Sequence, residues 1–202
     1  VGGTGVAKYG SVRVGHAEVA YKVDTGEKSV SIGYNSRVAG SYSVGIGATV
    51  YGSGSENVII GDGADTSGYN NGVAIGYSSK NSGGNDAVAI GHGANAKASK
   101  SIAIGSNSAA NAANSISIGS ATGNGAQYSI EIGSSSVAYN ADSGVALGRN
   151  SVTNHNYSVA LGTYSKTRAQ GVLDVSCAYS GTNYGYQGTN DSARTGLRVI
   201  SG

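Results

Sequence analysis

Four amino acids are missing from this 202-residue sequence: phenylalanine, tryptophan, methionine and proline. Conventional globular cores are filled efficiently by large side chains, so the lack of Phe, Trp and Met argues against such a core. The apolar fraction is 39%, and Val, Ile and Ala supply most of it. We therefore expect an architecture that can be built from small and β-branched side chains.

Charge and cysteine are also scarce. Thirteen Lys and Arg nearly balance eleven Asp and Glu, the net charge is +2, and 12% of residues are charged. That balance favours neither a nucleic-acid partner, which needs a basic stripe with aromatics, nor a membrane surface. Cys177 is the single cysteine, so no disulfide forms within one chain. No apolar run approaches membrane-spanning length, and we expect the chain to be a fragment whose export or anchoring segments lie elsewhere.

Glycine is abundant, at 35 residues, and much of it belongs to one repeated phrase. An aliphatic residue, any residue, an aliphatic residue and Gly recur eleven times, mostly at intervals of 14 or 15. The copies occupy 12–15, 30–33, 44–47, 58–61, 73–76, 88–91, 102–105, 116–119, 130–133, 145–148 and 159–162. A disordered chain has no reason to keep such a register. The fixed period predicts a solenoid with one coil per repeat.

Each triplet predicts a short strand, and small residues three and five positions past the Gly predict a second one. One repeat is then strand, Gly turn, strand and polar loop, which makes an all-β, two-sheet roll about 50 Å long. We expect the two aliphatics of each triplet to face the interior, so that Asp at Ile90 or Ile104 would disrupt the rod. The small middle residues would then face outward and let another subunit approach, with Arg13 and Glu131 as exceptions. The thin interior also predicts self-association.

Residues 86–91, 100–105 and 157–162 resemble the head repeats of trimeric autotransporter adhesins, the YadA-like family, and the likeness extends over roughly 11–167. The resemblance implies a left-handed parallel β-roll with 14–15-residue coils, a homotrimer, and exposure on the outer membrane of a Gram-negative bacterium. Residues 195–202 are similar to the start of the neck of that family. We therefore expect a head at 1–167 and a neck-like capping segment at 168–202, with stalk and membrane anchor outside this sequence.

Little in the sequence indicates catalysis or metal binding. His16, His92 and His155 are far apart, and His92 invites comparison with the interface His of left-handed β-helix acyltransferases. Those enzymes have longer coils of hexapeptides, so an exposed turn residue is the favoured interpretation. Asp62 and Asp65 faintly resemble a calcium loop, but calcium solenoids need consecutive copies. We predict no enzyme activity, no cofactor and no metal site.

All fourteen aromatic residues are tyrosines, a residue suited to wet binding surfaces. Tyr34 and Tyr77 directly follow a motif Gly, while Tyr42, Tyr128 and Tyr157 lie two residues before a triplet, so a regular rod aligns them in stripes. These stripes either cover edges and turns or bind a ligand. The predicted function is a non-catalytic adhesin head for host matrix proteins (collagen, fibronectin, laminin) or epithelial cell receptors. The alternative is a structural trimeric fibre segment without a host ligand.

Overall fold

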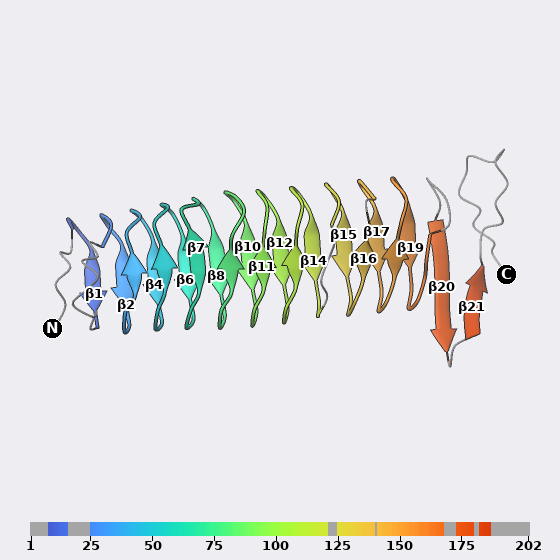
Figure 1. Cartoon of the computed structure of the whole chain (residues 1–202), viewed down its shortest axis with the longest axis horizontal. Coiled ribbons are helices and arrows are strands. Elements are labelled where there is room, and N and C mark those ends of the chain that lie inside the picture. Colours follow the sequence, from blue (N-terminus) through green and yellow to red (C-terminus); the bar gives the residue numbers. More distant parts are fainter. Residues whose placement is uncertain are drawn as a thin grey trace.

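The computed structural model describes residues 8–15, 25–120, 125–139 and 141–167, and the backbone alone of 173–179 and 182–186. It shows a rod in which successive coils stack along the long axis, with β1 (Val12–Val14) near one end and β20 (Leu173–Tyr179) and β21 (Thr182–Tyr186) at the other (Figure 1). Every regular element in the described part of the chain is a strand.

The first sheet contains all eleven predicted triplets. They pair in parallel and in register, so that Val88, Ala89 and Ile90 lie opposite Ile102, Ala103 and Ile104. The strands are β1 (Val12–Val14), β2 (Val30–Ile32), β4 (Val44–Ile46), β6 (Val58–Ile60), β8 (Val73–Ile75), β10 (Val88–Ile90), β12 (Ile102–Ile104), β14 (Ile116–Ile118), β15 (Ile130–Ile132), β17 (Val145–Leu147), β19 (Val159–Leu161), β20 (Leu173–Tyr179) and β21 (Thr182–Tyr186). The predicted parallel β-roll with 14–15-residue coils is confirmed.

The second sheet is made of the short strands that follow each Gly turn. One part is six-stranded and another is two-stranded. Its strands are β3 (Arg37–Val38), β5 (Tyr51–Gly52), β7 (Asp65–Ser67), β9 (Lys80–Asn81), β11 (Asn95–Ala96), β13 (Ala109–Ala110), β16 (Val137–Ala138) and β18 (Val152–Thr153). In the described part of the chain, eight of the eleven coils therefore contribute one strand to each sheet, and the two layers face each other across the interior.

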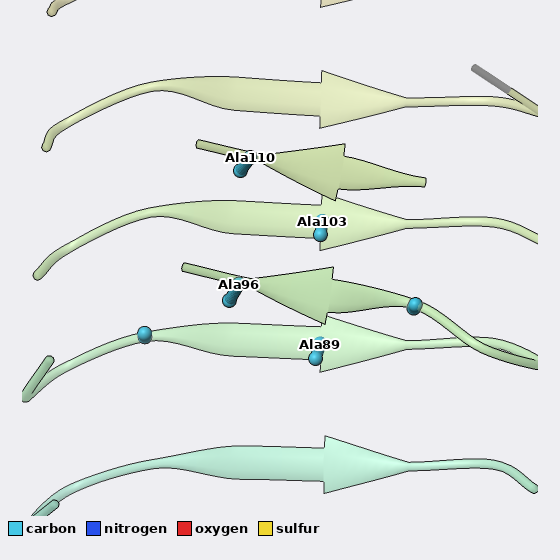
Figure 2. Close-up of a cluster of buried hydrophobic side chains, with 6 residues drawn as sticks. Ala89, Ala96, Ala103 and Ala110 are labelled. Carbon is cyan, nitrogen blue, oxygen red and sulfur yellow. The ribbon is translucent and has the colours of Figure 1, made fainter. Parts of the chain in front are cut away.

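The prediction of which side chains fill that interior was wrong. The middle residue of the triplet points inward, and the flanking aliphatics point outward. Ala74, Ala89 and Ala103 are fully buried, whereas their Val and Ile neighbours are only partly covered. Figure 2 shows Ala89 and Ala103 on the first sheet with Ala96 and Ala110 on strands of the second sheet, all within one buried cluster. The two layers lie too close for pairs of Val and Ile between them.

Size matching inside the roll explains the exceptions. Ile59 is the one large aliphatic among the buried middle residues, and a glycine lies opposite it. A Cβ on Gly52 would come 2.3 Å from Ile59 Cδ1, and a Cβ on Gly45 would come 2.2 Å from Val38 Cγ2. A large side chain on one sheet therefore requires a glycine opposite it on the other sheet, because the interior is closely packed.

Polar side chains complete the interior at the loop end of the coils. Ser43 N donates to Ser29 Oγ at 3.0 Å, Asn57 N donates to Ser43 Oγ at 3.0 Å, and Gly72 N donates to Asn57 Oδ1 at 2.7 Å. These buried side chains thus accept hydrogen bonds from the backbone of the next coil. The ladder satisfies amide groups that the short strands leave unpaired.

The motif Gly fixes the sharp turn out of each triplet. Gly105 has φ +126°, and a Cβ there would come 2.4 Å from the carbonyl oxygen of Gly119 in the next coil. Both the backbone conformation and the contact between coils therefore exclude a side chain.

The C-terminal end of the first sheet is formed by β20 and β21. β20 pairs in parallel with β19, Val159 lying opposite Leu173, and β21 pairs antiparallel with β20. Cys177 lies in β20, where only the backbone is described. The predicted boundary between a head at 1–167 and a segment at 168–202 stays a prediction, because most of 168–202 lies outside the described residues.

Candidate ligand-binding surface

The outer side of the first sheet is an aliphatic face, formed by the first and third residues of the triplets. The largest exposed fractions along it are 50% at Val12, 55% at Val14, 39% at Ile46, and 38% at both Leu147 and Leu161. The in-register pairing aligns these side chains in two continuous rows along the rod. A monomeric soluble protein rarely exposes so long an apolar surface.

The two long edges of the rod carry the predicted tyrosines. We call the edge after the motif Gly the turn edge and the edge before the triplet the loop edge. Tyr34 and Tyr77 lie on the turn edge, with 48% and 57% of their surface exposed. Tyr42, Tyr128 and Tyr157 lie on the loop edge, with 56%, 60% and 65% exposed. Their proposed role in binding stays a prediction.

On the turn edge, Tyr77 stacks on His92 from the next coil. Their ring centroids are 5.3 Å apart and the planes differ by 10°. His92 is exposed in its turn, the position favoured from the sequence. His16 lies outside the described residues, and His155 is half-buried in a closing loop.

On the loop edge, Tyr42 lies beside a cation. The Lys28 Nζ is 5.2 Å from the centre of the Tyr42 ring and donates to its hydroxyl at 3.4 Å. The adjacent Lys28 distinguishes Tyr42 from Tyr128 and Tyr157. Those two tyrosines hold the same position six and eight coils further along the rod.

Sequence reasoning missed three exposed tyrosines. Tyr9 is 81% exposed, Tyr139 is 45% exposed and Tyr164 is 44% exposed. The Arg149 guanidinium lies 5.2 Å from the centre of the Tyr164 ring, much as the Arg37 guanidinium lies 5.1 Å from the centre of the Tyr51 ring. Numbering each residue by its position within the coil would have found Tyr139, because it follows β16 directly and begins the polar loop.

The residue two positions before each triplet has a left-handed backbone. Its φ lies between +51° and +61° in every described coil from Lys28 to Tyr157. Asn71, Asp86 and Asn114 suit that conformation, which Asn and Asp tolerate well. Bulky Tyr42, Tyr128 and Tyr157 do not, although they adopt it.

A family model describes these coils. The YadA head domain repeat matches residues 25–49, 82–108, 96–126 and 140–165. In these segments the rod is similar to a YadA head domain. The coils between the matched segments carry the same triplets in the same register, at 58–60, 73–75 and 130–132.

One solved structure similar to this chain is the collagen-binding domain of the Yersinia adhesin YadA. The two are 23% identical in sequence, the match covers 88% of this chain and 75% of that one, and the TM-score is 0.39. Among curated proteins, none matches this sequence.

Asp62 and Asp65, the two acidic residues of the segment compared with a calcium loop, have partners within the chain. Asp62 Oδ1 accepts a hydrogen bond from Thr49 Oγ1 at 2.7 Å, and Asp65 Oδ1 accepts from the Ser67 amide. Within the described ranges, no three or more His, Cys, Asp or Glu residues are grouped as a metal site would require. The same part of the chain contains no helix long and apolar enough to cross a bilayer.

Glu131 is the one carboxylate inside the YadA-type roll among the described residues. It occupies the middle of β15, between Ser117 and Ala146, and is 1% exposed. Its Oε1 accepts from Ala138 N at 3.1 Å, while Oε2 is buried without a hydrogen-bond partner. Burial raises the pKa of Glu131 from 4.5 to about 7, and the hydrogen bond from Ala138 opposes part of that rise. The expectation that Glu131 would face outward was therefore wrong.

Proposed function

We propose that this chain is the non-catalytic head of a trimeric surface adhesin that binds host matrix proteins or host cell receptors. The observation that carries the proposal is the combination of YadA head repeats with a long uncovered aliphatic face. The repeats belong to an adhesin family, and the face needs a cover that a single chain does not provide.

Three copies of the chain supply that cover when their first sheets face a shared axis. The outward Val and Ile rows then form the dry centre of the trimer, and the second sheets and loops remain in water. Threefold display also multiplies weak contacts, because ligand sites on one rod bind an extended partner together. The bacterial cell surface is the setting that this role requires, with residues 168–202 as the transition toward the anchored part of the protein.

The ligand candidates are collagen, fibronectin, laminin and epithelial receptors. Collagen has the most direct support, since the similar solved domain from Yersinia is named for binding it. We assign the contact surface to the exposed tyrosines on the two edges: Tyr34, Tyr77, Tyr42, Tyr128 and Tyr157. Tyrosine offers an apolar ring and a hydroxyl at little entropic cost, which suits shallow, wet binding surfaces.

The test is a binding panel with the chain immobilised on a sensor surface. Collagens, fibronectin, laminin and epithelial receptor ectodomains are passed over it, and the chain with all five tyrosines changed to Ser serves as the comparison. Saturable binding of at least one protein, reduced at least tenfold in the variant, supports the proposal. A chain that binds none of them is instead a structural fibre segment, and binding unchanged in the variant places the contact surface elsewhere.

A further inference from the structure

Three exposed tyrosines gather at the loop edge near the C-terminal end of the described rod. Tyr128 and Tyr157 hold the same position two coils apart, and Tyr139 begins the loop of the coil between them. With about 4.8 Å per coil, the Cα atoms of Tyr128 and Tyr157 lie about 9.6 Å apart. The small Ser143 occupies the same position in the intervening coil, so space for a ring-sized group remains between the two tyrosines.

Folding does not explain these tyrosines. Tyr128 and Tyr157 have φ +59° and +57°, where a bulky side chain is strained. They are 60% and 65% exposed, so the burial of their side chains offsets little of the cost of the strained backbone. Asn114 and Asn71 hold the same position elsewhere with φ +58° and +56°, as that backbone favours. Strain without compensating packing points to a functional role.

The side chains around the tyrosines are polar and nearly uncharged. Gln127, Asp142 and Asn156 lie one residue before the turn position in the three coils, and Asn154 lies one coil beyond Tyr139. In the described closing loops 125–129, 139, 141–144 and 154–158, no Lys or Arg occurs and Asp142 is the one carboxylate. The loops near the N-terminal end differ, since Lys28 lies against Tyr42 there.

The backbone of this tyrosine patch is held in place before any ligand arrives. Ser143 N donates to Gln127 O at 3.0 Å, Tyr157 N donates to Asp142 O at 3.0 Å, and Asp142 N donates to Asn156 Oδ1 at 3.0 Å. Hydrogen bonds from coil to coil therefore fix the spacing of the rings, which lowers the entropic cost of binding.

We propose that Tyr128, Tyr139 and Tyr157 with Gln127, Asp142 and Asn156 form a binding site for a neutral oligosaccharide. A pyranose ring presents one apolar face of C–H groups, which packs on a tyrosine ring, and a rim of hydroxyls, which amides and a carboxylate bind. The lack of Lys and Arg in the described closing loops 125–129, 139, 141–144 and 154–158 disfavours sialylated or sulfated sugars. A protein partner fits less well, because the patch has none of the Trp and Arg typical of binding hot spots and is small for a stable protein interface.

This inference rests on the proposed adhesive function and names the chemistry that one part of the tyrosine surface recognises. The test uses the whole chain on an array of lactose-, N-acetyllactosamine- and mannose-terminated oligosaccharides with their sialylated and sulfated counterparts. The variant is Tyr128→Asn with Tyr157→Asn, since Asn suits the left-handed turn. Lys100→Asn is the matched control, because the exposed Lys100 holds the same position with φ +57° outside the patch and outside the tyrosine surface.

We expect the wild-type chain and the Lys100→Asn control to bind neutral sugars, and the double variant to lose at least tenfold in affinity. No bound sugar, a preference for anionic sugars, or equal binding by the double variant would overturn the inference. A double variant with a changed mass in sedimentation would overturn it too, since the tyrosines would then be subunit contacts.

The same proteins are also passed over laminin before and after enzymatic removal of its glycans. Binding that the double variant loses, and that deglycosylation abolishes, supports the sugar site. Binding to deglycosylated laminin that still requires Tyr128 and Tyr157 identifies a protein partner and overturns it. If wild-type chain binds matrix proteins but no sugar, the inference fails while the proposed function stands; if it binds neither, both fail.

Discussion

Individual residues in this rod are constrained most strongly where the two sheets and successive coils nearly touch. Glu131 is the clearest departure, because a carboxyl group occupies a position that Ala or Ser holds in most coils. The described inward-facing neighbours on the packed strands, Ser117, Ala138 and Ala146, carry no charge that could compensate it. The folded rod therefore holds the protonated form more readily than the ionised one.

Replacing Glu131 with Gln should remove a pH dependence of stability. The pKa of Glu131 is raised from 4.5 to about 7 in the folded state, so the folded chain binds the extra proton between those values. Stability from this group is complete below about pH 4.5 and is lost as pH rises through 7. The shift corresponds to at most about 3 kcal/mol. Urea unfolding at pH 4, 6 and 8 should show Glu131→Gln increasingly more stable than wild type as pH rises.

The matched control for that experiment is Glu56→Gln, a change on the exposed loop edge. It should leave the pH profile of unfolding as in wild type. Parallel profiles for wild type and Glu131→Gln would contradict the buried, neutral carboxyl.

The motif glycines support a second prediction at this scale. Gly105→Ala should destabilise the rod by several kcal/mol, because the new Cβ meets the Gly119 carbonyl and the backbone has positive φ. Gly68→Ala is the control, since a Cβ there meets only Ser53 Oγ at 3.6 Å. Thermal unfolding followed by circular dichroism compares the two, and equal melting temperatures would refute the close approach of the coils.

At the scale of the strand, the sequence predicted the elements but reversed their faces. The triplet, the Gly turn and the 14–15-residue period were enough to place eleven strands and a parallel register. Alternation says only that Ala89 and its neighbours Val88 and Ile90 lie on opposite sides, and either side could be the interior. Hydrophobicity favoured the aliphatics, but the narrow space between the sheets admits mainly Ala, Ser, Thr and Asn. The restriction of the middle position to small residues was the available signal.

This reversal changes what Asp substitutions should do. Ala89→Asp places a charge in the closed interior and should prevent the coil from folding, with loss of the β-sheet circular dichroism signal. Ile90→Asp places it on the aliphatic face and should leave the coils folded while weakening self-association. Retained assembly in Ile90→Asp, or an intact fold and assembly in Ala89→Asp, would restore the original assignment of faces.

The tyrosine surface was predictable only in part. Tyr42, Tyr128 and Tyr157 share a coil position that counting along the sequence reveals. Their left-handed backbone and the difference between a Lys28-flanked and an uncharged neighbourhood depend on how coils stack, which no linear count supplies.

At the scale of the whole molecule, the chain is a rod with one apolar face, whose exposure to water is unfavourable. Its length comes from repetition, and its two sheets are joined through an interior of small side chains. The outward-facing Val and Ile side chains form two apolar rows, and these rows lie on the outside of the roll. Stability and multivalent adhesion therefore both depend on assembly around that face.

Sedimentation equilibrium of the 202-residue chain measures that assembly. One chain weighs 19.9 kDa, and we expect a single species with three times that mass, which Ile90→Asp with Ile104→Asp converts toward the monomer. A folded wild-type monomer that stays monomeric at micromolar concentration would contradict that expectation.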